Sequence, residues 1–241
     1  MIKIKNIVKK FQDKTIIHSL DLSIKKGEFY ALIGPNGAGK STLIKLLTGL
    51  LQPTKGEIYL DGISMIENPK EAKAIIGYIP DEPTVWDGMT GLEFLNFVGA
   101  LYNIPATERE KDIKKLLKIY NLSGTENQLY QDYSRGVRQK YSILAAFLHK
   151  PSILLIDEPI VGLDPISIDI TKDLLDDFVK SGGTVLMVTH TLFVAQELAT
   201  RIGIFEKGKL KIEGTYKELV DKAHLPAKTS LDDVYKNYLV K

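Results

Sequence analysis

Cysteine is absent from the 241 residues of this chain, and tryptophan occurs once. The lack of cysteine excludes a disulfide-stapled scaffold, a thiolate zinc site and a cysteine nucleophile, and it suits a reducing compartment. Charge of one sign is also lacking, because 32 lysines and arginines face 30 aspartates and glutamates, giving a formal net charge of +2. No chain-wide basic field indicates a nucleic-acid coat, so we expect no direct contact with nucleic acid.

Long hydrophobic runs are missing as well. The apolar runs, such as Ile153–Ile156 and Val185–Val188, fall far short of the roughly 18 residues that a membrane-spanning helix needs. The first residues, Met1–Lys5, alternate charged and apolar side chains and lack the apolar block of a signal peptide. We therefore expect a cytoplasmic chain, in which any role at a membrane comes through a partner chain.

What remains is an ordinary globular mixture, with 44% hydrophobic and 26% charged residues. This composition excludes a disordered or fibrous chain and leaves enough apolar mass for a core. The length favours one large domain or one domain that carries an insertion.

Two hydrophobic periods predict an α/β fold. The start of the chain alternates apolar and polar residues, as in strands with one wet face. Four continuous apolar runs predict strands covered on both faces, and they are Phe29–Ile33, Ile75–Ile79, Ile153–Ile156 and Thr184–Val188. Helical spacing lies between them, for example at Leu43, Leu46, Leu47 and Leu50. This alternation predicts a mostly parallel sheet, with an antiparallel β flap formed by the opening strands.

The middle of the chain has a different pattern. Residues 92–102, 107–120 and 138–149 each have helical spacing, which predicts an inserted helical subdomain. Near the end, Leu231, Val234, Tyr235 and Tyr238 share one helical face. We therefore divide the single domain, residues 1–241, into an α/β core with its flap (1–89 and 151–220), a helical subdomain (90–150) and an amphipathic tail (221–241).

A glycine-rich run fits the phosphate-loop pattern G-x-x-x-x-G-K-[ST], and its residues are Gly34, Pro35, Asn36, Gly37, Ala38, Gly39, Lys40, Ser41 and Thr42. Glycines let successive N–H groups curl around phosphate oxygens, and the following helix directs its positive end at the same anion. Lys40 would supply a point charge for the β- and γ-phosphates, and Ser41 a hydroxyl for Mg²⁺. The run predicts a nucleotide site.

Two adjacent carboxylates end a later apolar run. Asp157 and Glu158 directly follow Ile153–Ile156, at the strand end where ligands of α/β sheets bind. Asp157 could anchor Mg²⁺ opposite Ser41, and Glu158 could orient and deprotonate an attacking water. With the phosphate loop, this pair predicts a P-loop NTPase core.

Further segments narrow the prediction. Asp132–Lys140 carries Ser134 and Gly136 just before a helix, Gly162–Pro165 follows the carboxylate pair, and Thr189-His190 ends an apolar strand. Together with the phosphate loop, these segments resemble the nucleotide-binding subunit of an ATP-binding cassette (ABC) transporter along essentially the whole chain. A P-loop kinase, the third hypothesis, leaves Ser134 and His190 unexplained.

The resemblance implies a role for each matching residue. Phe11 corresponds to the aromatic that stacks on adenine, although a strand-end core aromatic is the alternative. Ser134 and Gly136 correspond to the signature that meets the γ-phosphate of the other subunit, while Arg135 replaces the usual first glycine. Asp164 corresponds to the aspartate of the loop that crosses the dimer interface, and His190 to the histidine that contacts the γ-phosphate and Glu158.

Asp81 is a second departure from the family pattern. The family has a glutamine after a segment like Ile76–Pro80, and it touches Mg²⁺ and water and senses the membrane subunit. A carboxylate can accept a hydrogen bond from water or hold a hydrated cation, but it cannot donate and adds negative charge near a triphosphate. Two orientations stay open, one toward the nucleotide and one toward solvent or a backbone N–H of its loop.

These features predict an ATPase that powers a membrane transporter, with ATP and Mg²⁺ as cofactors. The resemblance implies head-to-tail pairing with a second cassette, identical or different, and separate membrane-spanning subunits at the cytoplasmic face of the cell membrane. The segment Gly88–Thr90 with Asn96-Phe97 is most similar to export-type systems. The alternative is a soluble ABC ATPase that acts as a switch on nucleic acid or the ribosome, which the near-neutral charge disfavours.

Overall fold

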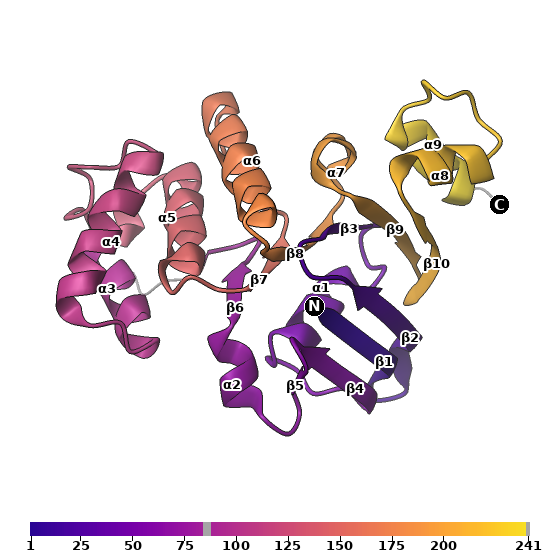
Figure 1. Cartoon of the computed structure of the whole chain (residues 1–241), viewed down its shortest axis with the longest axis horizontal. Helices are drawn as coiled ribbons and strands as arrows, with labels where there is room; N and C mark the ends of the chain where they lie inside the picture. Colours follow the sequence, from indigo (N-terminus) through magenta and orange to yellow (C-terminus); the bar gives the residue numbers. More distant parts are fainter. Residues whose placement is uncertain (84–87, 240–241) are drawn as a thin grey trace.

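A computed structural model describes residues 1–83 and 88–239 of the chain. Its central sheet has the strand order β10-β9-β3-β8-β7-β6 (Figure 1). The strands are β3 (Phe29–Ile33), β6 (Ile76–Ile79), β7 (Ile153–Asp157), β8 (Thr184–Thr189), β9 (Arg201–Glu206) and β10 (Lys209–Gly214). All neighbours pair in parallel except β10, which is antiparallel to β9. The expected mostly parallel α/β core is confirmed.

A second, fully antiparallel sheet has the order β2-β1-β4-β5. Its strands are β1 (Ile2–Phe11), β2 (Lys14–Ile24), β4 (Lys55–Leu60) and β5 (Ile63–Ser64). This sheet is the predicted flap. It lies beside α1 (Lys40–Leu47), which packs between it and the central sheet (Figure 1).

Alternation along β3 divides the core between the two faces of the central sheet. Tyr30 and Leu32 join the cluster shared with α1 and the antiparallel sheet. Phe29, Ala31 and Ile33 join the cluster on the other face, which includes helices later in the chain. Because successive strand residues point to opposite faces, a strand covered on both sides must be apolar throughout, as its sequence is.

Three helices occupy one end of the molecule, side by side (Figure 1). They are α3 (Gly91–Leu101), α4 (Ala106–Ile119) and α5 (Arg135–Leu148), with a 3-10 turn, η1 (Tyr130–Asp132), before α5. The sequence places the last helix at 138–149, whereas α5 begins three residues earlier because Ser134 caps it. The helices fall within 90–150, and the subdomain boundaries themselves stay a prediction.

The remaining helices are α2 (Pro69–Ala74), α6 (Pro165–Lys180), α7 (Leu192–Leu198), α8 (Tyr216–Lys222) and α9 (Leu231–Leu239). In α9, Leu231 and Val234 are buried, and Tyr235 and Tyr238 pack against the same cluster, as the helical face predicted. Within the described residues, no helix combines the length and apolarity needed to cross a bilayer.

One local expectation needs correction, and one hairpin was missed. Leu50 is not on the same helix as Leu43, because α1 ends at Leu47 and Gly49 follows with φ +66°. The hairpin of β9 and β10 was not predicted, since Gly203 interrupts the apolar pattern of β9. That glycine lets Tyr30 pack directly on the strand, and its Cβ would overlap the tyrosine hydroxyl.

Candidate nucleotide-binding site

The phosphate loop connects the end of β3 to the start of α1. Gly37 and Gly39 have φ of +77° and +105°, values that residues with a Cβ avoid. Lys40 is buried, and its Nζ donates to the carbonyl oxygens of Gly34 at 2.6 Å and Pro35 at 3.1 Å. The loop therefore encloses its own lysine, and the helix N-terminus and ammonium face one concavity.

Burial lowers the pKa of Lys40, and the nearby carboxylates of Glu158 and Asp157 act in the opposite direction. The ammonium thus loses hydration and keeps negative partners close by. An anionic ligand with several oxygens, such as a triphosphate, would accept hydrogen bonds from this ammonium in place of the water that burial removes.

Glu158 stands just past β7 in a left-handed backbone conformation, with φ +52°. Both of its carboxylate oxygens are held from the end of β8. Thr189 Oγ1 donates to Oε2 at 2.7 Å, the His190 N–H donates to Oε1 at 2.7 Å, and His190 Nδ1 lies 2.6 Å from the same oxygen. The left-handed conformation is strained, and these contacts from Thr189 and His190 hold the residue in it. Such a combination is typical of a functional carboxylate.

Asp157 is the last residue of β7. Burial raises its pKa, a hydrogen bond with Ser41 opposes the rise, and the charges of Glu158 and Asp81 add to it. A hydroxyl and a carboxylate that face each other fit Mg²⁺, which prefers oxygen ligands and keeps several waters. Among the described residues no group of three or more His, Cys, Asp or Glu side chains could hold a metal alone, so phosphate and water oxygens would complete the shell.

One cavity of about 490 Å³ unites these groups. The predicted residues that line it are Asn36, Gly37, Gly39, Lys40, Ser41, Thr42, Asp81, Asp157, Glu158 and His190. They come from the ends of β3, β6, β7 and β8. Parallel strands bring their carboxyl ends to one edge of the sheet, which explains why residues so far apart in sequence meet there.

Of the other predicted site residues, Gly34, Pro35 and Ala38 belong to the phosphate loop but do not line this cavity, and three lie elsewhere. Ser134 and Gly136 are at the start of α5, where Ser134 Oγ accepts from the Val137 N–H at 3.4 Å, and neither lines this cavity within the described chain. Phe11, at the end of β1, is 44% exposed, and the Lys9 ammonium lies 4.7 Å from its ring centroid. Among the described residues, Lys14 and Ile16 of β2 line the cavity, whereas Phe11 does not. Adenine stacking on Phe11 therefore stays a prediction.

Asp164 caps α6. Its carboxylate accepts from the Ser167 N–H at 2.9 Å and the Ser167 hydroxyl at 2.7 Å, and it pairs with Lys140 of α5 at 3.0 Å. The Ser167 hydroxyl and N–H, followed by Lys140, hold the pKa of Asp164 well below its usual range. The carboxylate is thus fixed within its own chain, and its expected place at a dimer interface remains untested.

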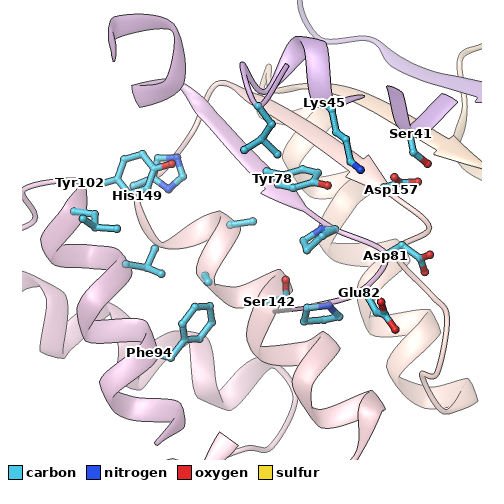
Figure 2. Close-up of a pocket in the computed structure, with 17 residues that line it drawn as sticks. Ser41, Lys45, Tyr78, Asp81, Glu82, Phe94, Tyr102, Ser142, His149 and Asp157 are labelled. Carbon is cyan, nitrogen blue, oxygen red and sulfur yellow. The ribbon is translucent and has the colours of Figure 1, made fainter. Parts of the chain in front are cut away.

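A second cavity, of about 650 Å³, adjoins the first one. Ser41, Asp81 and Asp157 line both cavities. Figure 2 shows these three residues at one end of the second cavity and the stacked rings of Tyr102 and His149 at the other. Apolar side chains from β6 and α3 form much of the wall between them. Asp81 therefore stands where a nucleotide pocket meets an apolar groove.

Some functional contacts escape a reading of the sequence. Thr189 was noted only as a strand end, yet its hydroxyl fixes Glu158 and also accepts from the Thr191 N–H at 2.8 Å. Lys14 and Ile16 belong to the antiparallel sheet, and no spacing connects them to the phosphate loop. A hydroxyl one residue before His190 was the one local signal available.

The geometry agrees with comparisons to known proteins. The family model described as "ABC transporter" matches residues 17–161. An uncharacterized ABC transporter ATP-binding protein of Bacillus subtilis, YthP, is 36% identical over 92% of this chain and 90% of its own. The lantibiotic transport ATP-binding protein SrtF of Streptococcus pyogenes is 33% identical over 90% of this chain and 91% of its own.

Solved structures give the same result. The structure of an ATP-binding subunit of an ABC transporter superposes with a TM-score of 0.94, at 29% identity and 99% coverage of both chains. A dimeric ATP-binding cassette in a post-hydrolysis state, bound to ADP and Pi, superposes with a TM-score of 0.80 at 29% identity, covering 89% of this chain and 98% of that one.

Proposed function

The chain belongs to the ABC transporter family as an ATP-binding, ATP-hydrolysing subunit, and we propose that it powers an export-type transporter from the cytoplasmic face of the cell membrane. The observation that carries this proposal is the single cavity shared by Lys40, Ser41, Asp157, Glu158 and His190. Kinship with a relative named for lantibiotic transport supports the export direction.

The residues divide the chemistry between binding and proton transfer. Lys40 and the loop N–H groups would hold the β- and γ-phosphates, and Ser41 and Asp157 would hold Mg²⁺, which would supply neutralisation of developing charge. Glu158 accepts the proton of the attacking water. Thr189 and His190 fix its carboxylate, so the base is oriented before the nucleotide arrives. The close approach of His190 Nδ1 also leaves its other ring nitrogen available to a γ-phosphate.

The position of Ser134 supports pairing with a second cassette. It caps α5 outside the phosphate-loop cavity of its own chain, with the helix N-terminus exposed beside it. In a head-to-tail dimer, this helix end would meet the γ-phosphate bound to the partner. Dimer closure on ATP and reopening after hydrolysis would then transmit force to the membrane subunits.

The apolar groove is where we place a segment of a membrane-spanning subunit. Tyr78, Phe94 and Val98 offer it an apolar wall, and Asp81 joins this wall to the nucleotide pocket. Burying apolar surface there would give a partner contact that responds to the nucleotide. Co-purification with a polytopic membrane protein supports this arrangement, whereas co-purification with ribosomes contradicts it.

Mixing two inactive variants tests the shared site. Ser134→Arg damages the helix end that serves the partner, and Glu158→Gln removes the base that serves the chain's own nucleotide. Each variant alone should be inactive. A mixed dimer places both lesions in one composite site and leaves the other intact, so mixing should restore part of the phosphate release. No recovery in a mixture that forms heterodimers would overturn the proposal of a shared site.

A further inference from the structure

The first turn of α5 touches the loop that follows β6 in the same chain. Arg135 Nη2 lies 3.5 Å from Asp81 Oδ1, and about half of each side chain is exposed. Asp81 lines the nucleotide cavity and the adjoining groove, while Arg135 begins α5 directly after its cap, Ser134. An ion pair therefore connects the helix end to the wall of the nucleotide pocket.

Neighbouring contacts show that α5 holds both this loop and the segment that follows β7. The Arg135 side chain packs over Gly162, whose Cβ would stand 3.2 Å from Arg135 Cγ and Cδ. Gln139, one turn further along, is buried, and its Nε2 donates to the carbonyl oxygens of Pro159 at 3.2 Å and Pro80 at 3.5 Å. The backbone before Asp81 is thus held, and the guanidinium is guided toward the carboxylate.

The Arg135–Asp81 pair matters for nucleotide binding because of the charges that line the cavity. Asp81, Asp157 and Glu158 all line it, and the positive side chains among the lining residues are Lys40 and Lys14. A triphosphate entering without metal would therefore meet several negative charges on the wall. The Arg135 guanidinium approaches the outermost of these carboxylates from the α5 side and offsets part of its charge.

We propose that Arg135 is a positioning residue that holds and partly neutralises Asp81 at the ATP pocket of its own chain. Through this pair, α5 sets how strongly ATP binding depends on Mg²⁺. The proposal rests on the proposed placement of ATP and Mg²⁺ at Lys40, Ser41 and Asp157. It gives Arg135 a role within its chain, distinct from the role of Ser134 toward the partner.

A double-mutant cycle on the full chain tests it, with the ATP dissociation constant measured by calorimetry in EDTA and again in Mg²⁺. Arg135→Gln should weaken metal-free binding by roughly two- to tenfold, since half-exposed charges are screened, and should enlarge the gain from Mg²⁺. Asp81→Asn should tighten metal-free binding and reduce that gain. In the Asp81→Asn background, Arg135→Gln should have no further effect.

Equal effects of Arg135→Gln in the parent chain and in the Asp81→Asn background would overturn the proposal, because the arginine would then act on ATP without Asp81. Arg135→Lys keeps the positive charge beside Asp81, so its gain from Mg²⁺ should stay close to that of the parent chain. If Arg135→Gln fails to fold, Arg135→Met keeps the aliphatic stem over Gly162 and removes only the charge.

Two controls separate this proposal from the proposed site. Lys114→Gln removes an exposed lysine of α4 and should leave both affinities unchanged. Lys40→Ala should weaken ATP binding by roughly 10- to 100-fold both with and without Mg²⁺. If Lys40→Ala binds ATP normally, the proposed site itself is wrong. If Lys40→Ala weakens binding while the cycle is additive, only the role of Arg135 is refuted.

Discussion

His190 Nδ1 lies 2.6 Å from Glu158 Oε1, and the backbone N–H of His190 donates to the same oxygen at 2.7 Å. The Glu158 carboxylate is therefore held by both the main chain and the side chain of His190, at the end of β8. These two contacts allow separate tests of the base and of its orienting group, because a substitution such as His190→Ala removes the ring and keeps the backbone N–H.

Glu158→Gln should keep ATP binding and lower turnover by about 10²–10⁴, the usual contribution of a positioned general base. The amide can preserve the local bonds, since its oxygen can accept from the His190 N–H and its nitrogen can donate to the Thr189 hydroxyl. Calorimetry and phosphate release measure the two effects. If turnover stayed within about twofold of the parent chain, the loss would be far smaller than that contribution. Glu158 would then not be the general base.

His190→Ala should lower kcat by about 10² and change KM for ATP far less, because a carboxylate that loses its orienting ring leaves the productive geometry. Steady-state phosphate release gives both constants. His18→Ala is the matched control, since His18 is exposed on β2. Equal losses in the two variants would show a general effect on folding instead of an effect at the site.

Lys40→Ala should weaken ATP binding by roughly 10- to 100-fold, the equivalent of a charge-assisted hydrogen bond of about 1.5–3 kcal/mol. Lys118→Ala, which removes an exposed lysine of α4 far from the phosphate loop in sequence, should bind ATP as the parent chain does. A fluorescent ATP analogue in equilibrium titration compares the two, and the site assignment fails if both variants bind alike.

Asp157→Asn should raise the stability of the metal- and nucleotide-free chain while impairing Mg²⁺-dependent hydrolysis. The folded-state pKa of Asp157 is raised by burial, so its charged form costs stability at neutral pH, and that cost disappears as pH falls toward the ordinary value of 3.8. The gain should therefore be largest near neutral pH and shrink as the solution becomes acidic. Thermal unfolding detects it, because about 1 kcal/mol moves the melting temperature by roughly 2–4 °C in a chain this size.

Asp61→Asn supplies a control of opposite sign. Burial would raise the pKa of Asp61, but hydrogen bonds from the N-terminal ammonium and from Ser152 outweigh it, so the pKa is lowered. Its charged form therefore adds stability at neutral pH that is lost as pH falls below the ordinary value. Asp61→Asn should lower the melting temperature at neutral pH, and a change in the same direction as Asp157→Asn would contradict this account.

The parts of the site that follow from the sequence are those carried by contiguous residues. The glycine-rich run before Lys40 and the carboxylates after Ile153–Ile156 each combine a strand, a turn and a chemical group in one stretch, so their positions follow from local rules. The parallel sheet follows too, because runs covered on both faces are apolar throughout.

Contacts between distant segments do not follow from such rules. Nothing local relates Arg135 to Asp81, or Gln139 to the carbonyl of Pro159, since these pairs form only once α5 has docked on the sheet. The same holds for β9, where Gly203 breaks the hydrophobic pattern to make room for Tyr30. The orientation of Asp81 was undecidable in sequence because its partner lies on another element.

The length of α5 has a consequence for how this chain can vary. The helix runs about 21 Å from its cap at Ser134 toward β7, which pairs with β6 in the register Ile76↔Ile153. An inserted residue inside α5 would turn Ser134 and Arg135 by about 100° and shift them by about 1.5 Å, while the sheet stayed intact. Insertions and deletions should therefore be tolerated between α4 and η1, residues 120–129, and be rare within α5, because the length of this helix sets the distance from the sheet to Ser134 and Arg135.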